Sequence, residues 1–417
     1  MATKKEIKKK VRASSTRTHN RRKTPWYSRA PRWVLVLGTV IALALLGTGG
    51  AVSYAKYKLD SLVPRLPIIG TIVYTAPTAN EQAIDLPTSV TDLVTQAADA
   101  SSGFRLVRVD GDGTISSKVV DATPKLPDGE VAKVEARKRD ATNALLDNLK
   151  GDLNGAVATV SGESLLGGLQ RLTNLDTTKP VILIGSLLDT TSPFDFRSLG
   201  FDTNVPELAD KLKQADELPK LDGADIRIVV RGTAGDQPQL RTVQNDYRQA
   251  AWSTVLKASG ASSVSFSYPD GSTPTATVPA PVVPIPPPPS TPVVPESTPT
   301  GTICTLLGGT YFQPDKPVLL DRVATLKAIE KCVAAMPPGA KVTVTGYTAG
   351  ADPKNSFALT LSQQRADVVR DLLVALGIAK GDITTFGKGN SNDRPYPKAP
   401  DDPRNRCVVI TADTGTK

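Results

Sequence analysis

The chain has 417 residues, enough for about three domains of ordinary size, so a single small module is excluded. It contains one histidine, His19, and three cysteines, which are too few for a Ser-His-Asp triad, a histidine-ligated metal or a zinc knuckle. The net charge of +9 comes from residues 1–32, where twelve Lys and Arg face the single Glu6 and sum to +11. The rest of the chain is therefore slightly negative.

The basic tail over residues 1–32 is followed by 22 uncharged residues at 33–54. About 20 apolar residues suffice for a helix that spans a bilayer core. Because positive charge stays on the cytoplasmic side, we expect a single-pass membrane helix at 33–54, with the bulk of the chain outside at the cell wall. A cleaved signal peptide is the alternative, since small residues follow at 47–53. We expect no nucleic-acid partner, although a basic tail would suit a polyanion.

Residues 64–272 alternate short apolar runs with amphipathic stretches. The runs predict strands at 71–75, 104–109, 181–184, 226–230 and 264–268, and the stretches predict helices at 89–100, 130–149, 206–215 and 240–259. This alternation predicts a doubly wound, mainly parallel, Rossmann-like α/β domain.

Three polar turns, 75–81, 185–195 and 231–239, follow strands of this predicted domain. The carboxyl ends of parallel strands share one edge of a sheet, so the turns are candidates for a single ligand site. None carries a dinucleotide, phosphate or calcium fingerprint, and ordinary turn chemistry accounts for them equally well. We assign no catalytic residue, metal or cofactor here.

A proline-rich segment over residues 273–300 separates the two predicted folded units, with eleven prolines at 274–299. Each proline removes a hydrogen-bond donor, so we expect polyproline II and neither helix nor strand. At about 3.1 Å per residue, the segment would form a semi-rigid spacer of roughly 80 Å.

Residues 301–417 predict a second α/β unit, a sandwich of helices and strands. The predicted order is a strand near Thr310, a helix at 319–333, a strand at 341–345, a helix at 361–376, and strands at 383–386 and 407–412.

Short motifs within this unit resemble the OmpA-like peptidoglycan-binding domain in order and approximate spacing, over residues 308–412. They are Gly346-Tyr347-Thr348, the Leu361–Ala366 sequence LSQQRA, Gly377-Ile378, Gly387-Lys388-Gly389 and Asn405-Arg406. In that family an aspartate after Gly-x-Thr receives the ammonium of a stem peptide, and the arginine of LSxxRA pairs with its carboxylate. The resemblance thus implies a peptidoglycan site rather than an enzyme, with the candidate residues Arg365, Asp352, Thr348, Tyr347, Ser362 and Arg406.

Arg365 suits this role physically, because a planar guanidinium binds a carboxylate through two parallel hydrogen bonds. It falls in the first turn of the predicted helix, where the helix dipole also favours an anion. The alternative is a surface arginine paired with Asp352, Asp367 or solvent.

The chain departs from the family pattern at several positions. Ala349 stands at the aspartate position, Ala358 replaces an asparagine, and Cys407 replaces the second arginine of the last strand. The loop before Ser362 is also one residue longer. We expect Asp352 to supply the missing carboxylate; otherwise binding would be weakened, altered in stem specificity or lost.

Cysteines outside the membrane can oxidise. Cys304 precedes the predicted first strand and Cys332 ends the first helix, which predicts a disulfide between them. Cys407 lies in a β run and is predicted to be a buried thiol.

Residues 64–272 resemble the envelope domain that precedes OmpA-like modules in some actinobacterial proteins, through Asn80-Glu81, Leu218-Pro219, Pro238-Gln239 and Trp252. The leading hypothesis is a membrane-anchored envelope protein that tethers the membrane to peptidoglycan. The alternatives are an interaction or assembly protein with a degenerate OmpA-like domain, and a wall-localised hydrolase that uses the middle domain. An unknown protein partner of the middle domain also stays open.

Overall fold

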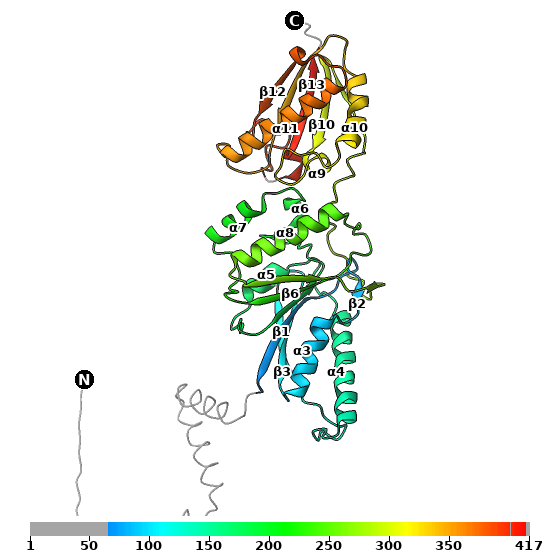
Figure 1. The fold of residues 1–417 in the computed structure, drawn as a ribbon, viewed down its shortest axis with the longest axis vertical. Helices are drawn as coiled ribbons and strands as arrows, with labels where there is room; N and C mark the ends of the chain where they lie inside the picture. The colour runs from blue at the N-terminus through cyan, green and yellow to red at the C-terminus, as the bar shows by residue number, and fades with distance from the viewer. Residues whose placement is uncertain (1–65, 401, 414–417) are drawn as a thin grey trace, which may run out of the picture. The chain divides into compact units, whose positions relative to one another are not determined.

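The computed structural model describes residues 66–400 and 402–413 (Figure 1). The predicted basic tail at 1–32 and the predicted membrane helix at 33–54 lie outside these residues. Over the described ranges, no helix is both long and apolar enough to cross a membrane.

The middle domain is built on a six-stranded sheet with the order β4-β3-β1-β5-β6-β7. The strands are β1 (Ile68–Thr75), β3 (Gly103–Val109), β4 (Ile115–Asp121), β5 (Val181–Gly185), β6 (Asp225–Val230) and β7 (Ser263–Ser267). Every neighbouring pair is parallel except β3 with β4. The predicted mainly parallel sheet is confirmed. The sequence did not predict β4, an edge strand whose side chains are mostly exposed and which therefore has no apolar run.

Helices cover both faces of this sheet. They are α3 (Thr88–Asp99), α4 (Glu135–Gly155), α5 (Leu165–Arg171), α6 (Phe196–Leu199), α7 (Val205–Gln214) and α8 (Thr242–Ala258). Successive side chains of a strand point to opposite faces. Accordingly, Ile72 and Tyr74 pack with α3 and α4, which lie side by side in Figure 1, whereas Val73 packs with α5, α7 and α8. The domain is therefore doubly wound, as predicted.

Two smaller features of the middle domain were not predicted. The helix α5 contains Gly167 and Gly168, which lower helix propensity. A Cβ on Gly168 would lie 2.5 Å from Val109 Cγ1, so glycine lets α5 pack directly on β3. The short strands β2 (Ala83–Ile84) and β8 (Gly271–Ser272) pair as an antiparallel ribbon.

The proline-rich segment lies against both folded regions, so the predicted semi-rigid spacer is wrong. The expectation of neither helix nor strand is wrong too, since residues 296–298 form a strand. Val283 is buried in the middle domain, and Gln237 exchanges two hydrogen bonds with its backbone, at 2.8 and 3.0 Å. Further along, Tyr311 donates to the carbonyl of Thr291 at 2.7 Å, and Glu296–Thr298 forms the strand β9. Polyproline carbonyls have no partners within their own helix, so donors on a folded surface can hold them. The described residues from 66 onward accordingly belong to one compact unit.

The C-terminal domain has a five-stranded sheet with the order β12-β11-β13-β10-β9. Its other elements are β10 (Gly301–Leu307), α9 (Gly308–Tyr311), α10 (Arg322–Ala334), β11 (Lys341–Gly346), α11 (Ser356–Ala375), η2 (Lys380–Asp382), β12 (Ile383–Gly387), η3 (Pro403–Asn405) and β13 (Cys407–Asp413). Only β11 and β12 run parallel. The predicted α/β class is confirmed, but the first strand ends before Thr310, which lies in α9.

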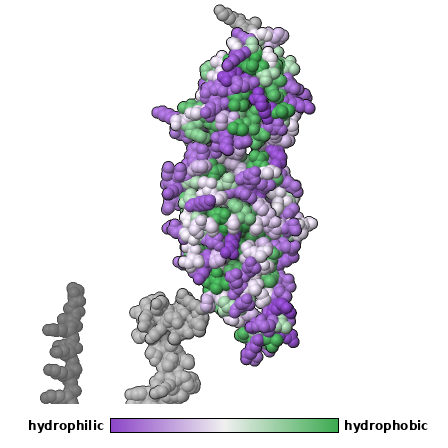
Figure 2. Space-filling model, in the orientation of Figure 1, coloured by the Kyte–Doolittle hydropathy of each residue, from purple (hydrophilic) through white to green (hydrophobic). Residues whose placement is uncertain are grey.

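Apolar side chains of α10 and α11 pack on this sheet and form a separate hydrophobic core. On the face seen in Figure 2, hydrophilic and hydrophobic residues are interleaved over both domains.

The helix α11 begins five residues earlier than predicted. Asn355 caps it, because its side-chain oxygen accepts a hydrogen bond from the amide of Ala358 at 2.9 Å. Arg365 therefore lies in the third turn, and its predicted place in the first turn is wrong. The helix dipole is felt mainly within the terminal turn, so it contributes little at Arg365.

Cys304 of β10 and Cys332 of α10 form a disulfide, while Cys407 of β13 is a buried thiol. Burial raises the pKa of Cys407 to about 12. The disulfide closes a loop with a sequence separation of 28 residues.

Loss of this disulfide is expected to lower the free energy of unfolding by about 3 kcal/mol, because the unfolded chain regains the entropy of an open loop. Urea unfolding with and without reductant measures the effect. The double variant Cys304→Ala/Cys332→Ala is the control, since reductant should not change its stability. Peptide mapping without reductant that finds Cys304 alkylated, or Cys407 in the bridge, would contradict the pairing.

Candidate functional site

Two glycines allow α11 to lie directly on the C-terminal sheet. Gly346 and Gly387 pair in register at the ends of β11 and β12. A Cβ on Gly346 would lie 2.0 Å from the carbonyl oxygen of Ser362, and one on Gly387 would lie 2.5 Å from the amide nitrogen of Gln363. The helix backbone therefore touches the sheet one turn before Arg365 and fixes where that side chain is presented.

Ser362 is part of this contact. It is fully buried, and its hydroxyl donates to Leu359 O and accepts from the amide of Gly389, both at 2.9 Å. Its side chain is not in the cavity wall described next. The structure gives Ser362 the role of joining α11 to the loop after β12.

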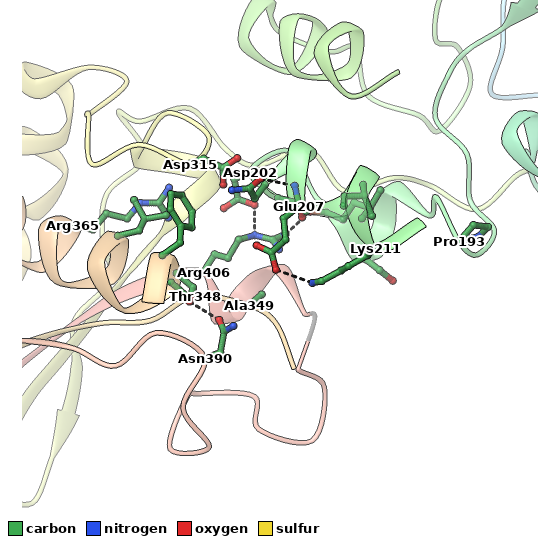
Figure 3. A pocket seen from close by; sticks show the side chains of 18 residues that line it. Pro193, Asp202, Glu207, Lys211, Asp315, Thr348, Ala349, Arg365, Asn390 and Arg406 are labelled. Atoms are coloured by element: carbon green, nitrogen blue, oxygen red, sulfur yellow. Dashed lines mark hydrogen bonds and ion pairs between the residues drawn. The ribbon is translucent and has the colours of Figure 1, made fainter. Parts of the chain in front are cut away.

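A cavity of about 270 Å³ lies beside α11 (Figure 3). Three of the predicted site residues line it: Thr348, Arg365 and Arg406. Ala349, at the family's aspartate position, lines it as well. The polar residues of the wall that were not predicted are Asn390 and Asp315 from the C-terminal domain and Ser198, Asp202, Thr203, Asn204, Glu207 and Lys211 from the middle domain.

Arg365 is 2% exposed and is held from several sides. Its Nε and Nη2 donate to the carbonyls of Lys316 and Gln313, both at 3.2 Å, and its guanidinium lies 5.1 Å from the ring centroid of Phe312. No carboxylate of residues 66–400 or 402–413 lies within ion-pair distance of it. Asp367 instead pairs with Arg370 at 2.9 Å, so the surface-arginine alternative is wrong.

The electrostatic surroundings of Arg365 are mixed. Burial lowers the pKa of its guanidinium, while Asp202 and Asp315 act in the opposite direction. Arg406 also lowers that pKa, as a neighbouring cation does. Arg406 is paired with Asp202 and Lys211 with Glu207, so among the described residues Arg365 is the lining cation without an ion pair, and a guanidinium suits an anionic group.

Asp315 is a carboxylate in the cavity wall that belongs to the C-terminal domain itself. Burial raises its pKa to about 7, although Arg365 acts against that rise. At neutral pH its carboxyl group is therefore divided between the neutral and ionised forms. A cation bound beside it would favour the ionised form.

Thr348 and Asn390 form another polar part of the cavity wall. The Thr348 hydroxyl donates to Asn390 Oδ1 at 2.6 Å, and its amide donates to the carbonyl of Gly389. The Asn390 amide donates in turn to the backbone carbonyl of Asp352 at 2.9 Å. Asn390 directly follows the glycine motif at 387–389, a signal from which the sequence could have indicated it.

Besides Ser362, two predicted residues lie outside the cavity wall, Asp352 and Tyr347. Asp352 is exposed, and its carboxylate accepts the amide of Lys354 at 2.9 Å, so the structure does not bring it to the site as the missing carboxylate. Tyr347 donates its amide to Cys407 O, and burial raises the pKa of its hydroxyl to about 12.

The three polar turns of the middle domain do meet. Glu81 accepts hydrogen bonds from the amides of Thr78 and Ser186 at 3.1 Å, and it forms a β-bridge with Thr233. Glu81 is fully enclosed, and burial raises its pKa. These carboxylate contacts are internal to the fold, so they join the turns to one another.

The fold and the cavity together define an α/β domain with a polar cavity beside α11. Residues 311–406 match the OmpA family, so the chain carries an OmpA family domain there. Thr348, Arg365, Asn390 and Arg406 all lie within the matched residues.

Three solved structures illustrate what this domain is similar to. The periplasmic domain of Helicobacter pylori MotB is 21% identical, with 30% of this chain and 89% of that chain covered and a TM-score of 0.25. The cell wall anchor of the T6SS from Pseudomonas aeruginosa is 25% identical, with 29% and 87% covered and a TM-score of 0.23. An outer membrane protein from Borrelia burgdorferi is 19% identical, with 29% and 97% covered and a TM-score of 0.22. No curated protein matches the chain.

Proposed function

We propose that this protein binds peptidoglycan non-covalently through its OmpA family domain, with Arg365 holding the free carboxylate of a stem peptide. The observation that supports this most is the state of Arg365, a buried guanidinium on a cavity wall with no carboxylate at ion-pair distance in the described chain. Burying an arginine is costly unless a negative partner compensates it. A ligand carboxylate would supply that partner.

The second half of the proposal concerns the ammonium of the stem peptide. Ala349 cannot receive it, and Asp352 is outside the cavity wall. Asp315 and Glu207 are carboxylates that do line the cavity. We assign the counter-charge to Asp315, because an arriving ammonium would ionise a carboxyl group whose pKa is about 7. The carboxylate of a zwitterionic stem end would then pair with Arg365, and its ammonium would pair with Asp315.

The tether to the membrane is proposed from the sequence. The +11 tail followed by 22 uncharged residues is typical of a single-pass anchor with its amino terminus in the cytoplasm. Together with a wall-binding domain outside, this makes the protein a link between membrane and peptidoglycan.

One observation favours a second candidate, an envelope interaction protein with a degenerate OmpA-like domain. The family's aspartate is replaced by Ala349, and Arg406 is already paired with Asp202 of the middle domain. In that case, the cavity would serve contact between domains and not a ligand.

The two candidates are separated by co-sedimentation of the purified full chain with peptidoglycan. Arg365→Ala is expected to reduce retention at least about 30-fold, since removing one partner of a buried charged pair costs about 2–5 kcal/mol. Arg365→Lys should rescue little, because an ammonium cannot copy the two-pronged contact. Arg370→Ala is the matched control on the same helix, where the half-buried arginine already pairs with Asp367 and Asp371 of this chain.

Circular dichroism and thermal unfolding establish that the Arg365 variants are folded. If folded Arg365→Ala sediments with peptidoglycan as the wild type does, this site does not hold the wall, and the interaction-protein candidate takes its place.

A further inference from the structure

The loop 199–202 of the middle domain contacts Arg406 in the cavity wall. Asp202 Oδ1 forms an ion pair with Arg406 Nε, and the carbonyl of Leu199 accepts a hydrogen bond from Arg406 Nη2 (Figure 3). The side chains of Arg406 and Asp202 are 8% and 3% exposed. The contact is therefore enclosed, and salt screens buried pairs much less than exposed ones.

The same carboxylate also neighbours Arg365. Its second oxygen, Oδ2, is buried and has no hydrogen-bond partner within the described part of the chain. A Cβ on Gly308 would lie 2.8 Å from this oxygen and 3.2 Å from Arg365 Nη1, so both atoms lie beside the same glycine. One carboxylate of the middle domain thus lies near both arginines of the proposed site.

The fold supports this placement of Asp202. The helix α6 ends at Leu199 and is followed by Gly200, whose φ of +63° is a conformation that glycine adopts readily. A Cβ on Gly200 would lie 2.8 Å from Arg406 Nη2, so a side chain there would obstruct the approach. Phe201, the next residue, is buried in the core of the middle domain and anchors the loop.

We infer that the loop 199–202 is an internal competitor of the ligand, because the Asp202 carboxylate occupies Arg406, the arginine near Arg365 that a stem-peptide carboxylate would also bind. The inference rests on the proposed function of the site. A ligand carboxylate that pairs with both Arg365 and Arg406 must displace Asp202 from Arg406, so this mode of binding and the docking of the loop exclude each other. The apparent affinity is then the intrinsic affinity multiplied by the fraction of molecules with a free site. Binding to the wall releases the loop.

The test compares Asp202→Asn and Asp202→Ala with the wild-type full chain in calorimetric titrations with a purified muropeptide that has a free stem-peptide carboxylate. Both variants are expected to bind at least about tenfold tighter, because the site is freed. Asp210→Asn is the control, since Asp210 is an exposed carboxylate on α7, and it should bind as the wild type does. Equal or weaker binding by both Asp202 variants would overturn the inference.

A measurement without ligand separates this inference from the proposed function. Hydrogen exchange of the amides at 199–202 should be faster in Asp202→Asn than in the wild type, because the docked contact is lost. If no protein binds the muropeptide but exchange rises, the proposed function fails and the docking contact stands. If the wild type binds and Asp202→Asn changes neither affinity nor exchange, the proposed function stands and the competitor is refuted.

Discussion

Arg231→Met is expected to lower the free energy of unfolding by about 3–5 kcal/mol, the cost of leaving a buried charge without its partner. Arg231 is 0% exposed, directly after β6. Its guanidinium donates to Gln82 O and Asn154 Oδ1 at 3.2 Å and to Leu153 O at 2.6 Å. The variant leaves these acceptors unpaired and removes the cation that lowers the pKa of Glu81.

Arg227→Met is the matched control, four residues earlier in β6. Arg227 pairs with Asp225 at 2.9 Å with both side chains over 40% exposed, and such surface pairs contribute about 0–1 kcal/mol. Urea unfolding of both variants measures the difference. Equal losses would show that the buried arginine has no special role in joining the polar turns.

The loss in free energy of unfolding caused by Arg231→Met should also depend on pH. Burial raises the pKa of Glu81 and that of Glu163, and Arg231 opposes the rise at Glu81. A carboxyl group with a raised folded pKa costs stability as the pH rises through that value. Without Arg231 the pKa of Glu81 rises further, so the variant should lose more stability relative to the wild type at pH 8 than at pH 5.

Gly346→Ala is expected to cost about 3 kcal/mol, the upper end of what overpacking a core usually costs. The added Cβ would meet the carbonyl oxygen of Ser362 at 2.0 Å, so α11 must move away from the sheet. Because α11 carries Arg365, the variant should also lose retention on peptidoglycan.

Gly381→Ala is the control for this prediction. Gly381 lies in η2, with no atom within 4 Å of where its Cβ would stand, so the change should be within about 0.5 kcal/mol. Thermal unfolding and co-sedimentation compare the two variants. A Gly346→Ala protein as stable as Gly381→Ala would mean that α11 has room to shift, and that the glycine does not position the site.

The sequence alone determined the features that depend on neighbouring residues. Apolar runs such as 181–184 predicted buried parallel strands, and 3.6-residue periodicity predicted α7 and α8 within two residues of their observed ends. The LSQQRA motif indicated the family domain that the match at 311–406 shows. These features can be predicted because they depend on residues close together in the sequence or on motifs that recur in known domains.

The start of α11 was not predicted correctly from the local sequence pattern. Its first turn holds Asn355, Ser356 and Phe357 before the apolar face begins, and the capping asparagine is the signal that was available there. The edge strand β4 was missed for a similar reason, since its side chains bury little surface and show no apolar run.

Only the tertiary structure decided how the site is completed. Asp202 and Arg406 are 204 residues apart, and neither stands in a pattern that points to the other. The burial of Arg365 and the exposure of Asp352 likewise depend on packing between segments. The position of the proline-rich segment also depends on tertiary contacts, since Gln237 and Tyr311 donate hydrogen bonds to its carbonyls. Such contacts form between surfaces that exist only after each segment has folded, so no periodicity along the chain predicts them.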